Sequence, residues 1–254
     1  MEKLIRPIAY IETDFKEKFG IPRQPLLVKG LTGRIIFEPE YRHPDALKGI
    51  EQFSHLWLIW DFSENDNTIF HATVKPPRLG GKTHVGVFAS RSPFRPNGMG
   101  LSVVRLVKVE QTEENGQVLV VEGADMLDGT PIYDIKPYIP LVDCQREAVD
   151  GYTAETRKIS LEVECPEEVW TVREPDMDGN LPKPCEKSEE EHRTEIVPLE
   201  KRQQIIEILS QDPRPRYGVD SDREYGMFFD KWNVKFVVKD GKVTVTKVES
   251  NKYE

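Results

Sequence analysis

The amino-acid sequence predicts a mainly β protein that ends in a small α+β module, a helix followed by a β-hairpin. Two observations lead to this fold class. Through about residue 165, short β-branched and aromatic runs alternate with turns that contain glycine or proline, which favours a barrel or sandwich over a sheet with alternating helices. From about residue 195, an apolar stripe at helical spacing precedes two alternating runs around a turn.

The N-terminal part contains several runs of strand length and one short helix signal. The predicted strands are residues 5–11, 33–37, 55–62, 85–89, 103–109 and 118–123. Asn115-Gly116 lies between the last two and predicts a hairpin turn. Pro44 and Asp45 open a predicted helix over residues 44–53.

The composition changes between residues 166 and 194, where glutamate, aspartate and proline dominate. This stretch predicts a solvated connector between an N-terminal domain, residues 1–165, and a C-terminal module, residues 195–254. Within the module, residues 198–210 predict a helix with Pro198 in its first turn. Asp240-Gly241, between the alternating residues 228–238 and 242–248, predicts a hairpin.

Charge is distributed unevenly along the chain. The net charge is −9, yet residues 67–109 carry seven lysines and arginines and no carboxylate. A positive segment on an acidic protein is expected either to hold an anionic partner or to pair with carboxylates elsewhere in the fold, and the sequence leaves both open.

Other classes of protein are disfavoured. The apolar runs are too short to span a bilayer, and no apolar signal segment follows Met1, so we expect a cytoplasmic protein without membrane contact. Three widely spaced cysteines, without a Cys/His cluster, predict free thiols and no metal site.

Three segments carry side chains suited to ligand binding. In KFGIPRQP, residues 18–25, two prolines bracket Arg23 and Gln24 and restrict their presentation, although a plain surface loop fits as well. Residues 86–102 form a loop rich in arginine, proline and glycine, in which Arg91 and Arg95 are able to converge on one anion and Phe94 to stack on a purine. Residues 125–140, DMLDGTPIYDIKPYIP, supply carboxylates, a hydroxyl, an ammonium and a phenol.

Together these segments carry a family resemblance. The phrases KFGIPRQP, FSHLWLIW, PPRLGGKTHVGVFASRSPFRPNGMGLS, DMLDGTPIYDIKPYIP and DPRPRYG occur in order between residues 16 and 218. In this the chain resembles the TsaA/TrmO family of S-adenosylmethionine-dependent tRNA adenosine N6-methyltransferases. The resemblance implies an N-terminal β-barrel and a homodimer with the cofactor near the subunit interface. No GxGxxG follows any predicted strand, which agrees with a fold other than the Rossmann fold.

The resemblance also implies residue roles. The positions that match the family's S-adenosylmethionine site are Pro22, Arg23, Gln24, Phe62, Ser63, Arg91, Leu101, Asp128, Gly129, Thr130 and Pro131. The implied substrate is tRNA with N6-threonylcarbamoyladenosine at position 37, beside the anticodon, which receives a methyl group on the same N6.

Catalysis and RNA binding are expected from further residues. In-line methyl transfer depends on positioning, and Asp128 or Asp134 is expected to accept the N6 proton while Lys136 and Tyr138 stabilise charge or hold the base. The expected contacts to the anticodon stem-loop are Lys75, Arg78, Lys82, Phe94, Arg95, Arg214 and Arg216. For the C-terminal module, RNA contact and dimer packing both fit. Two rival functions remain at this stage, an S-adenosylmethionine sensor and an RNA-binding module without catalysis.

Overall fold

A computed structural model describes residues 4–65, 69–76, 79, 83–154, 160–173, 194–214 and 223–250. Its contacts divide the chain into two compact units. The first comprises Met1–Thr13, Ile21–Lys158 and Arg214–Val219, and the second comprises Asp14–Gly20, Ile159–Pro213 and Asp220–Glu254. Within the described ranges, no helix is long and apolar enough to cross a membrane.

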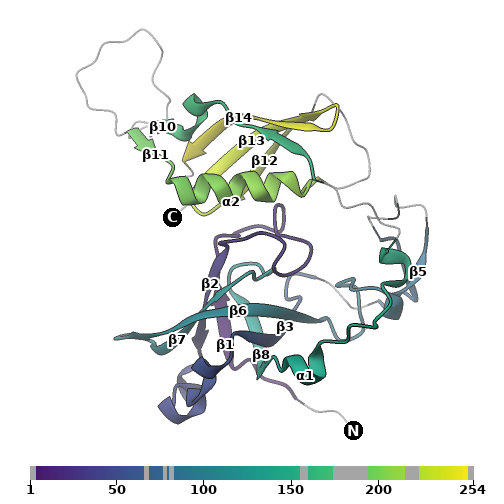
Figure 1. The fold of residues 1–254 in the computed structure, drawn as a ribbon, viewed down its shortest axis with the longest axis vertical. Coiled ribbons are helices and arrows are strands. Elements are labelled where there is room, and N and C mark those ends of the chain that lie inside the picture. The colour runs from purple at the N-terminus through teal and green to yellow at the C-terminus, as the bar shows by residue number, and fades with distance from the viewer. Residues whose placement is uncertain are drawn as a thin grey trace. The chain divides into compact units, whose positions relative to one another are not determined.

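The first unit is built on a closed ring of six strands, so the predicted barrel is confirmed (Figure 1). Around the ring the strands are β1 (Ala9–Glu12), β2 (Thr32–Phe37), β7 (Gly116–Glu122), β6 (Met99–Thr112), β3 (His55–Asp61) and β8 (Thr130–Pro137). Every neighbouring pair is antiparallel, and β8 closes the ring by pairing with both β3 and β1.

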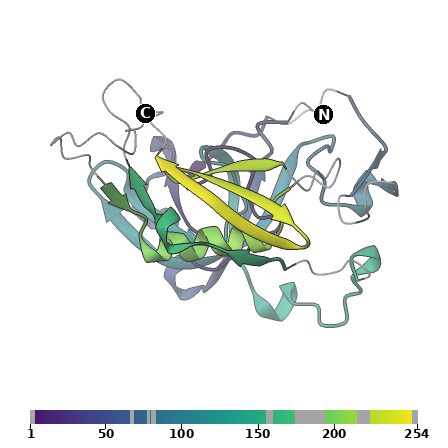
Figure 2. The same ribbon diagram turned by 90° about the horizontal axis from the view of Figure 1, so that it is seen from above.

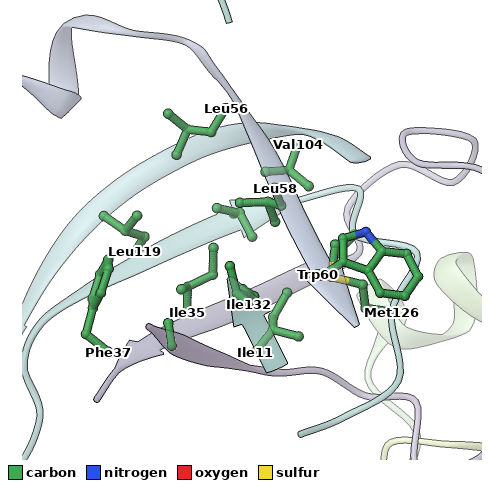
Figure 3. Close-up of a cluster of buried hydrophobic side chains, with 13 residues drawn as sticks. Ile11, Ile35, Phe37, Leu56, Leu58, Trp60, Val104, Leu119, Met126 and Ile132 are labelled. Carbon is green, nitrogen blue, oxygen red and sulfur yellow. The ribbon is translucent and has the colours of Figure 1, made fainter. Parts of the chain in front are cut away.

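Alternation along the strands fills the barrel with apolar side chains. In β3 every second residue is buried, which points Leu56, Leu58 and Trp60 inward. They pack with Ile35 of β2, across the ring, and with Ile132 of the neighbouring strand β8 (Figure 3). Burying a large apolar side chain of this kind contributes roughly 1.5–3 kcal/mol, so this cluster is a main source of the unit's stability.

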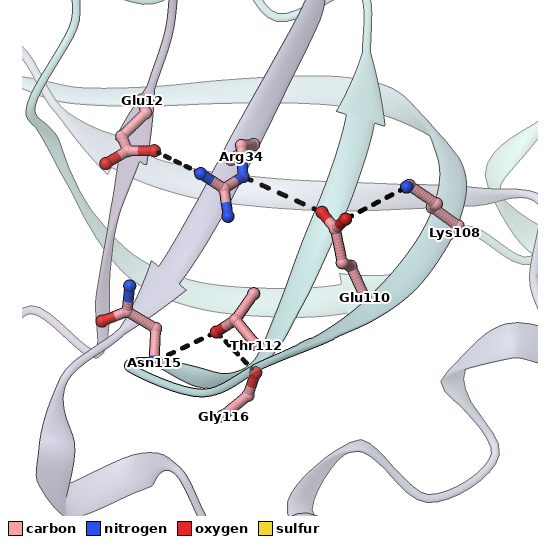
Figure 4. Close-up of polar contacts among 7 residues, drawn as sticks. All are labelled: Glu12, Arg34, Lys108, Glu110, Thr112, Asn115 and Gly116. Atoms are coloured by element: carbon pink, nitrogen blue, oxygen red, sulfur yellow. Dashed lines mark hydrogen bonds and ion pairs between the residues drawn. The ribbon is translucent and has the colours of Figure 1, made fainter.

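The outer face of the barrel carries an exposed chain of charged side chains. Arg34 Nη1 lies 3.3 Å from Glu12 Oε2 and Arg34 Nε lies 4.0 Å from Glu110 Oε2, which Lys108 flanks (Figure 4). Exposed ion pairs of this kind contribute little because water screens them. Beside them the predicted Asn115-Gly116 turn is confirmed, with the Asn115 N–H bonded to Thr112 Oγ1 at 3.1 Å and Gly116 at φ 65°.

Two local predictions for the first unit are wrong. Residues 44–53 form no single helix but two 3-10 helices, Pro44–Leu47 and Ile50–Gln52, because Gly49 between them adopts φ 88°. Residues 85–89 are strand only at β5 (Val85–Gly86), which pairs with β4 (Thr73–Val74), and then turn into a 3-10 helix over Val87–Ala89. The remaining short elements of this unit are 3-10 helices at Pro39–Tyr41 and Gly151–Thr153 and the helix α1 (Pro140–Asp143).

The second unit is a four-stranded sheet with a helix along one face (Figure 1, Figure 2). The sheet order is β12 (Glu224–Phe229), β13 (Trp232–Lys239), β14 (Lys242–Ser250) and β9 (Glu162–Glu164), and the last pair is parallel. The helix α2 (Leu199–Ser210) and the β13–β14 hairpin match the predicted helix and hairpin. A 3-10 helix, Glu167–Trp170, and the small sheet of β10 (Thr171–Arg173) and β11 (Thr194–Ile196) complete the unit.

A short N-terminal segment belongs to this second unit. Phe15 is buried and meets Phe229 edge-on at 5.4 Å between ring centroids, and the Asp230 N–H donates to the Asp14 carbonyl at 2.8 Å. Lys201 of α2 lies 2.5 Å from Asp14 Oδ2. The predicted domain limits therefore differ from the compact units at both ends, since residues 14–20 and 162–164, both within the predicted N-terminal domain, belong to the second unit.

Gly100 provides a test of the barrel's packing. A Cβ there would lie 2.2 Å from Cε2 of the Trp60 indole, which is held inside the barrel. We expect Gly100→Ala to lower the free energy of unfolding by about 1–3 kcal/mol because the indole or the strand must move. Urea denaturation measures this.

The matched control is Gly86→Ala, since no atom lies within 4 Å of a Cβ at Gly86. If both variants unfold at the wild-type urea concentration, the indole does not occupy the position described.

Candidate active site

A buried polar chain marks one end of the barrel, where β3 ends and β6 begins. Trp60 Nε1 donates to Ser102 Oγ at 3.0 Å, and Ser102 Oγ donates to Asp125 Oδ1 at 2.6 Å. Ser102 is only 1% exposed, so its hydroxyl depends on these two partners. Burial raises the pKa of Asp125 to about 6, although the Ser102 hydrogen bond and the nearby Arg91 act in the opposite direction.

Arg91 joins this chain to the proline-bracketed loop. Its Nη1 donates to Gln24 Oε1 at 2.5 Å, and the Gln24 amide donates to the Arg23 carbonyl at 2.6 Å. Arg23 Nη2 donates to the Arg214 carbonyl at 3.3 Å. The structure therefore brings the predicted residues Arg23, Gln24 and Arg91 together, with Arg214 beside them and Pro22 in the same loop.

Apolar side chains flank these polar groups. The Phe62 ring lies 4.3 Å from the Trp60 ring between centroids, and the Phe62 N–H donates to the Gly98 carbonyl at 2.8 Å. Leu101, opposite Ile59 in the β3–β6 ladder, is 57% exposed. Ser63 is exposed in the turn after β3. The predicted residues Phe62, Ser63 and Leu101 thus lie at the same end of the barrel as Asp125.

The turn before β8 is rigid. Asp128 Oδ1 accepts the Thr13 N–H at 2.9 Å, and the Gly129 N–H donates to the Ile11 carbonyl at 2.8 Å, with Gly129 at φ 74°. Thr130 is buried, and its hydroxyl donates to the Leu127 carbonyl at 2.7 Å. Pro131 is opposite Tyr10 in the β1–β8 ladder. Asp128 therefore has a structural task at the closure of the barrel, whatever else it does.

Lys136 and Tyr138 lie at the other end of β3. Lys136 is opposite Trp57, and the Tyr138 N–H donates to the His55 carbonyl at 2.9 Å. At about 3.4 Å per residue, they are separated from Phe62 by roughly 20 Å along the strand. Lys136 Nζ lies 2.8 Å from Asp134 Oδ2. Desolvation, with help from Cys144 and Asp143, raises the pKa of the Tyr138 phenol.

The predicted RNA contacts are only partly described. Arg78, Lys82 and Arg216 lie outside the described residues. Lys75 and Phe94 are exposed, and Arg95 Nη1 donates to the Ser90 carbonyl at 2.7 Å. Two other cations of residues 67–109 are paired on the barrel: Arg105 bonds to Glu122, and Lys108 lies 3.3 Å from Glu110. Of the two interpretations of the positive segment, an anionic partner or internal pairing with carboxylates, the second therefore holds for Arg105 and Lys108.

Comparison with known proteins decides the family. The profile described as tRNA-methyltransferase O N-terminal domain matches residues 10–144, and that of the TrmO C-terminal domain matches residues 180–251. The chain belongs to the tRNA-methyltransferase O family. The TrmO resemblance drawn from the sequence motifs is therefore confirmed, over both parts of the chain.

Relatives of this TrmO family chain match it along nearly the whole length. The tRNA (adenine(37)-N6)-methyltransferase of Escherichia coli is 35% identical over 95% of this chain and 96% of its own. A putative S-adenosylmethionine-dependent methyltransferase of Pseudomonas aeruginosa is 38% identical over 89% of each chain. A crystal structure of TrmO from Pseudomonas aeruginosa superposes with a TM-score of 0.70 at 30% identity, covering 99% of this chain and 98% of that one.

The sequence analysis assigned no role to Trp60, Ser102 and Asp125. Asp125 opens the quoted DMLDGTP phrase, but nothing local marks it as buried. The register of β3 and β6 brings Trp60 to Ser102, and the loop between β7 and β8 carries Asp125 to the Ser102 hydroxyl.

Asp125 provides a pH-dependent test of this TrmO site. Because its pKa is raised to about 6 in the folded protein, the folded state binds more protons than the unfolded state between about pH 4 and 6, and stability falls as pH rises through that window. Asp125→Asn keeps an acceptor for Ser102 and removes the charge. We expect its free energy of unfolding to exceed that of wild type by about 1–3 kcal/mol at pH 7.5, and this difference to vanish near pH 4.

Denaturant titrations at both pH values measure this difference. Asp150→Asn, a change at an exposed carboxylate, is the control and should show no such difference. If Asp125→Asn is less stable than wild type at pH 7.5, burial of the charged carboxylate is not the dominant effect of Asp125 on folding stability.

Proposed function

We propose that this protein transfers the methyl group of S-adenosylmethionine to N6 of adenosine 37 in tRNA, on a nucleotide that already carries the threonylcarbamoyl group. The observation that carries the proposal is the match to tRNA (adenine(37)-N6)-methyltransferase over nearly the whole of both chains. The geometry supports it, because the residues expected to bind the cofactor gather from separate segments at one end of the barrel.

The chemistry of that end suits S-adenosylmethionine, which supplies the methyl group. The cofactor carries a carboxylate, an ammonium, a sulfonium and an adenine. Arg91 offers a guanidinium for a carboxylate, and Asp125 offers a negative charge for a cationic group. Phe62 and the exposed Leu101 offer apolar surface. Each part of the cofactor thus has a suitable partner among residues described at this end.

Positioning carries most of the mechanism. Methyl transfer from a sulfonium is an in-line displacement, so the chain must align the N6 nitrogen with the methyl carbon. The Arg91–Gln24 hydrogen bond and the Ser102–Asp125 hydrogen bond fix side chains that would otherwise lose rotamer freedom on binding. We infer that Asp128 or Asp134 accepts the N6 proton, and that Lys136 and Tyr138 hold the modified base.

These roles imply that two copies of the chain share a site. Within one chain Lys136 and Tyr138 lie at the far end of β3 from Phe62. We infer a homodimer in which the cofactor end of one copy meets the Lys136–Tyr138 end of the other. The support is exposed apolar surface at both ends, Leu101 at one and Leu141 and Val142 of α1 at the other.

The substrate assignment is tested with purified protein, labelled S-adenosylmethionine and two tRNA preparations, one with and one without the threonylcarbamoyl group. We expect methylation of the modified tRNA alone, because N-acylation makes the N6 proton more acidic and adds groups for Lys136 and Tyr138 to bind. Mass spectrometry of the digested nucleosides identifies the product. Equal methylation of both preparations would show that the threonylcarbamoyl group is not required and leave adenosine 37 as the substrate. No product from either preparation would contradict the proposed activity.

Arg91→Ala tests the cofactor site. Loss of a charged hydrogen-bonding group should weaken S-adenosylmethionine binding about 10- to 150-fold. Isothermal calorimetry measures the affinity, and Arg34→Ala, an exposed arginine on the outer barrel, should leave it unchanged.

The same variant tests the shared site. Arg91→Ala and Lys136→Ala should each be inactive alone, yet co-expression should restore about a quarter of wild-type activity, because about half of the dimers are mixed and one of the two sites in each mixed dimer is intact. Absence of rescue would place both residues in the site of a single chain.

A further inference from the structure

Exposed aromatic side chains gather beside the Arg91 loop. Phe88 is 72% exposed and Phe70 is 59% exposed, and their rings stack at 6.4 Å between centroids with an interplanar angle of 27°. Ile69 and Phe94 are also exposed in this stretch of the chain. Soluble proteins leave few apolar groups of this size together in water unless the surface binds something.

The Phe70–Phe88 pair is held in place by the backbone. The two-residue ladder of β4 and β5 joins their segments, and the Val87 N–H donates to the Ala72 carbonyl at 3.0 Å. Val87 is only 1% exposed, so it anchors the turn while the next side chain, Phe88, points to solvent. The surface is therefore preorganised, which lowers the entropic cost of binding a ligand.

Arg95 adds charge to this aromatic surface. Its guanidinium carbon lies 5.9 Å from the centre of the Phe88 ring, and its Nη1 donates to the Ser90 and Val87 carbonyls at 2.7 and 3.3 Å. No aspartate or glutamate occurs anywhere from residue 67 to residue 109. A flat apolar ring beside a cation, without a carboxylate nearby in the sequence, suits a ligand that combines a π-face with negative charge.

We propose that Phe70 and Phe88 form a stacking platform for unpaired RNA bases next to the nucleotide that is methylated. This inference rests on the proposed tRNA substrate and names the part of it that the platform binds. The platform lies close to the candidate active site. Arg95 donates to the carbonyl of Ser90, and Arg91, which follows Ser90 in the chain, donates to Gln24 in that site. Bases of a single-stranded loop expose the faces that such rings need, whereas paired bases in a stem do not.

Substitutions at Phe88 separate stacking from simple apolar contact. Phe88→Ala and Phe88→Leu should both weaken binding of an anticodon stem-loop RNA, by about 5- to 150-fold for the alanine variant. Phe88→Trp should keep wild-type affinity because it keeps a π-face. Phe70→Ala should act in the same direction. Val149→Ala, another exposed apolar side chain, is the matched control.

Four measurements complete the experiment. Fluorescence anisotropy at several salt concentrations should show that the phenylalanine variants lose affinity without a change in the slope of log affinity against log salt, because no phosphate contact is lost. A fluorescent purine analogue beside the target adenosine should be quenched by wild type and by Phe88→Trp only. Melting curves and sedimentation velocity confirm that fold and assembly are intact.

The outcomes are distinct. If wild type binds and methylates the RNA but Phe88→Ala and Phe88→Leu bind it equally well, the platform is overturned and the proposed function stands. If the variants change the assembly state and keep RNA affinity, the surface joins copies of the chain and the platform is also overturned. If wild type binds no RNA, both proposals fall.

Discussion

The placement of the Trp60 indole is the constraint on which the candidate active site depends. A buried indole needs a hydrogen-bond acceptor, and Ser102 Oγ provides one at 3.0 Å. The same hydroxyl then donates to Asp125, so one side chain helps to fix the position of a carboxylate in the loop between β7 and β8. The ring also leaves no room for a side chain at residue 100 and offers a face against which Phe62 packs.

From this fixed end of the barrel, the binding groups extend outward in order of decreasing burial. Ser102 is almost fully buried, Asp125 is partly buried, and Arg91 is exposed. Arg91 donates to Gln24, and the Leu26 N–H of the same loop donates to the Gly123 carbonyl at 2.9 Å. The loops thus contribute the chemistry while the barrel contributes the positions, which is the usual division between a rigid scaffold and its functional loops.

Local sequence patterns were sufficient for the elements that local interactions determine. Runs of β-branched and aromatic residues placed β2, β3 and β7, and the dipeptides at Asn115 and Asp240 placed two hairpins. β8 escaped prediction because Pro131, Asp134 and Lys136 interrupt its alternation; it is a strand because β1 and β3 pair with it from both sides. Those partners are distant in sequence, so no local pattern reveals them.

The same limit applies to the site. The phrases around Arg23, Arg91 and Asp128 identified the segments that carry binding groups, and the structure brings the first two into contact through Gln24. The burial that raises the pKa of Asp125 arises from long-range packing, so no local sequence pattern predicts it. Nor does the sequence show that Asp128 lies in the turn before β8 while Lys136, eight residues later, lies near the far end of that strand.

The membership of residues 14–20 in the second unit has a consequence for the order of events during synthesis. Phe15 and Asp14 are synthesised before five of the six barrel strands, but their partners Phe229, Asp230 and Lys201 are made only after the last barrel strand. The barrel strands between them are complete well before that point. Folding of this chain therefore cannot strictly follow the order of its residues: Phe15 remains without its packing partner until residues beyond the last barrel strand have been made.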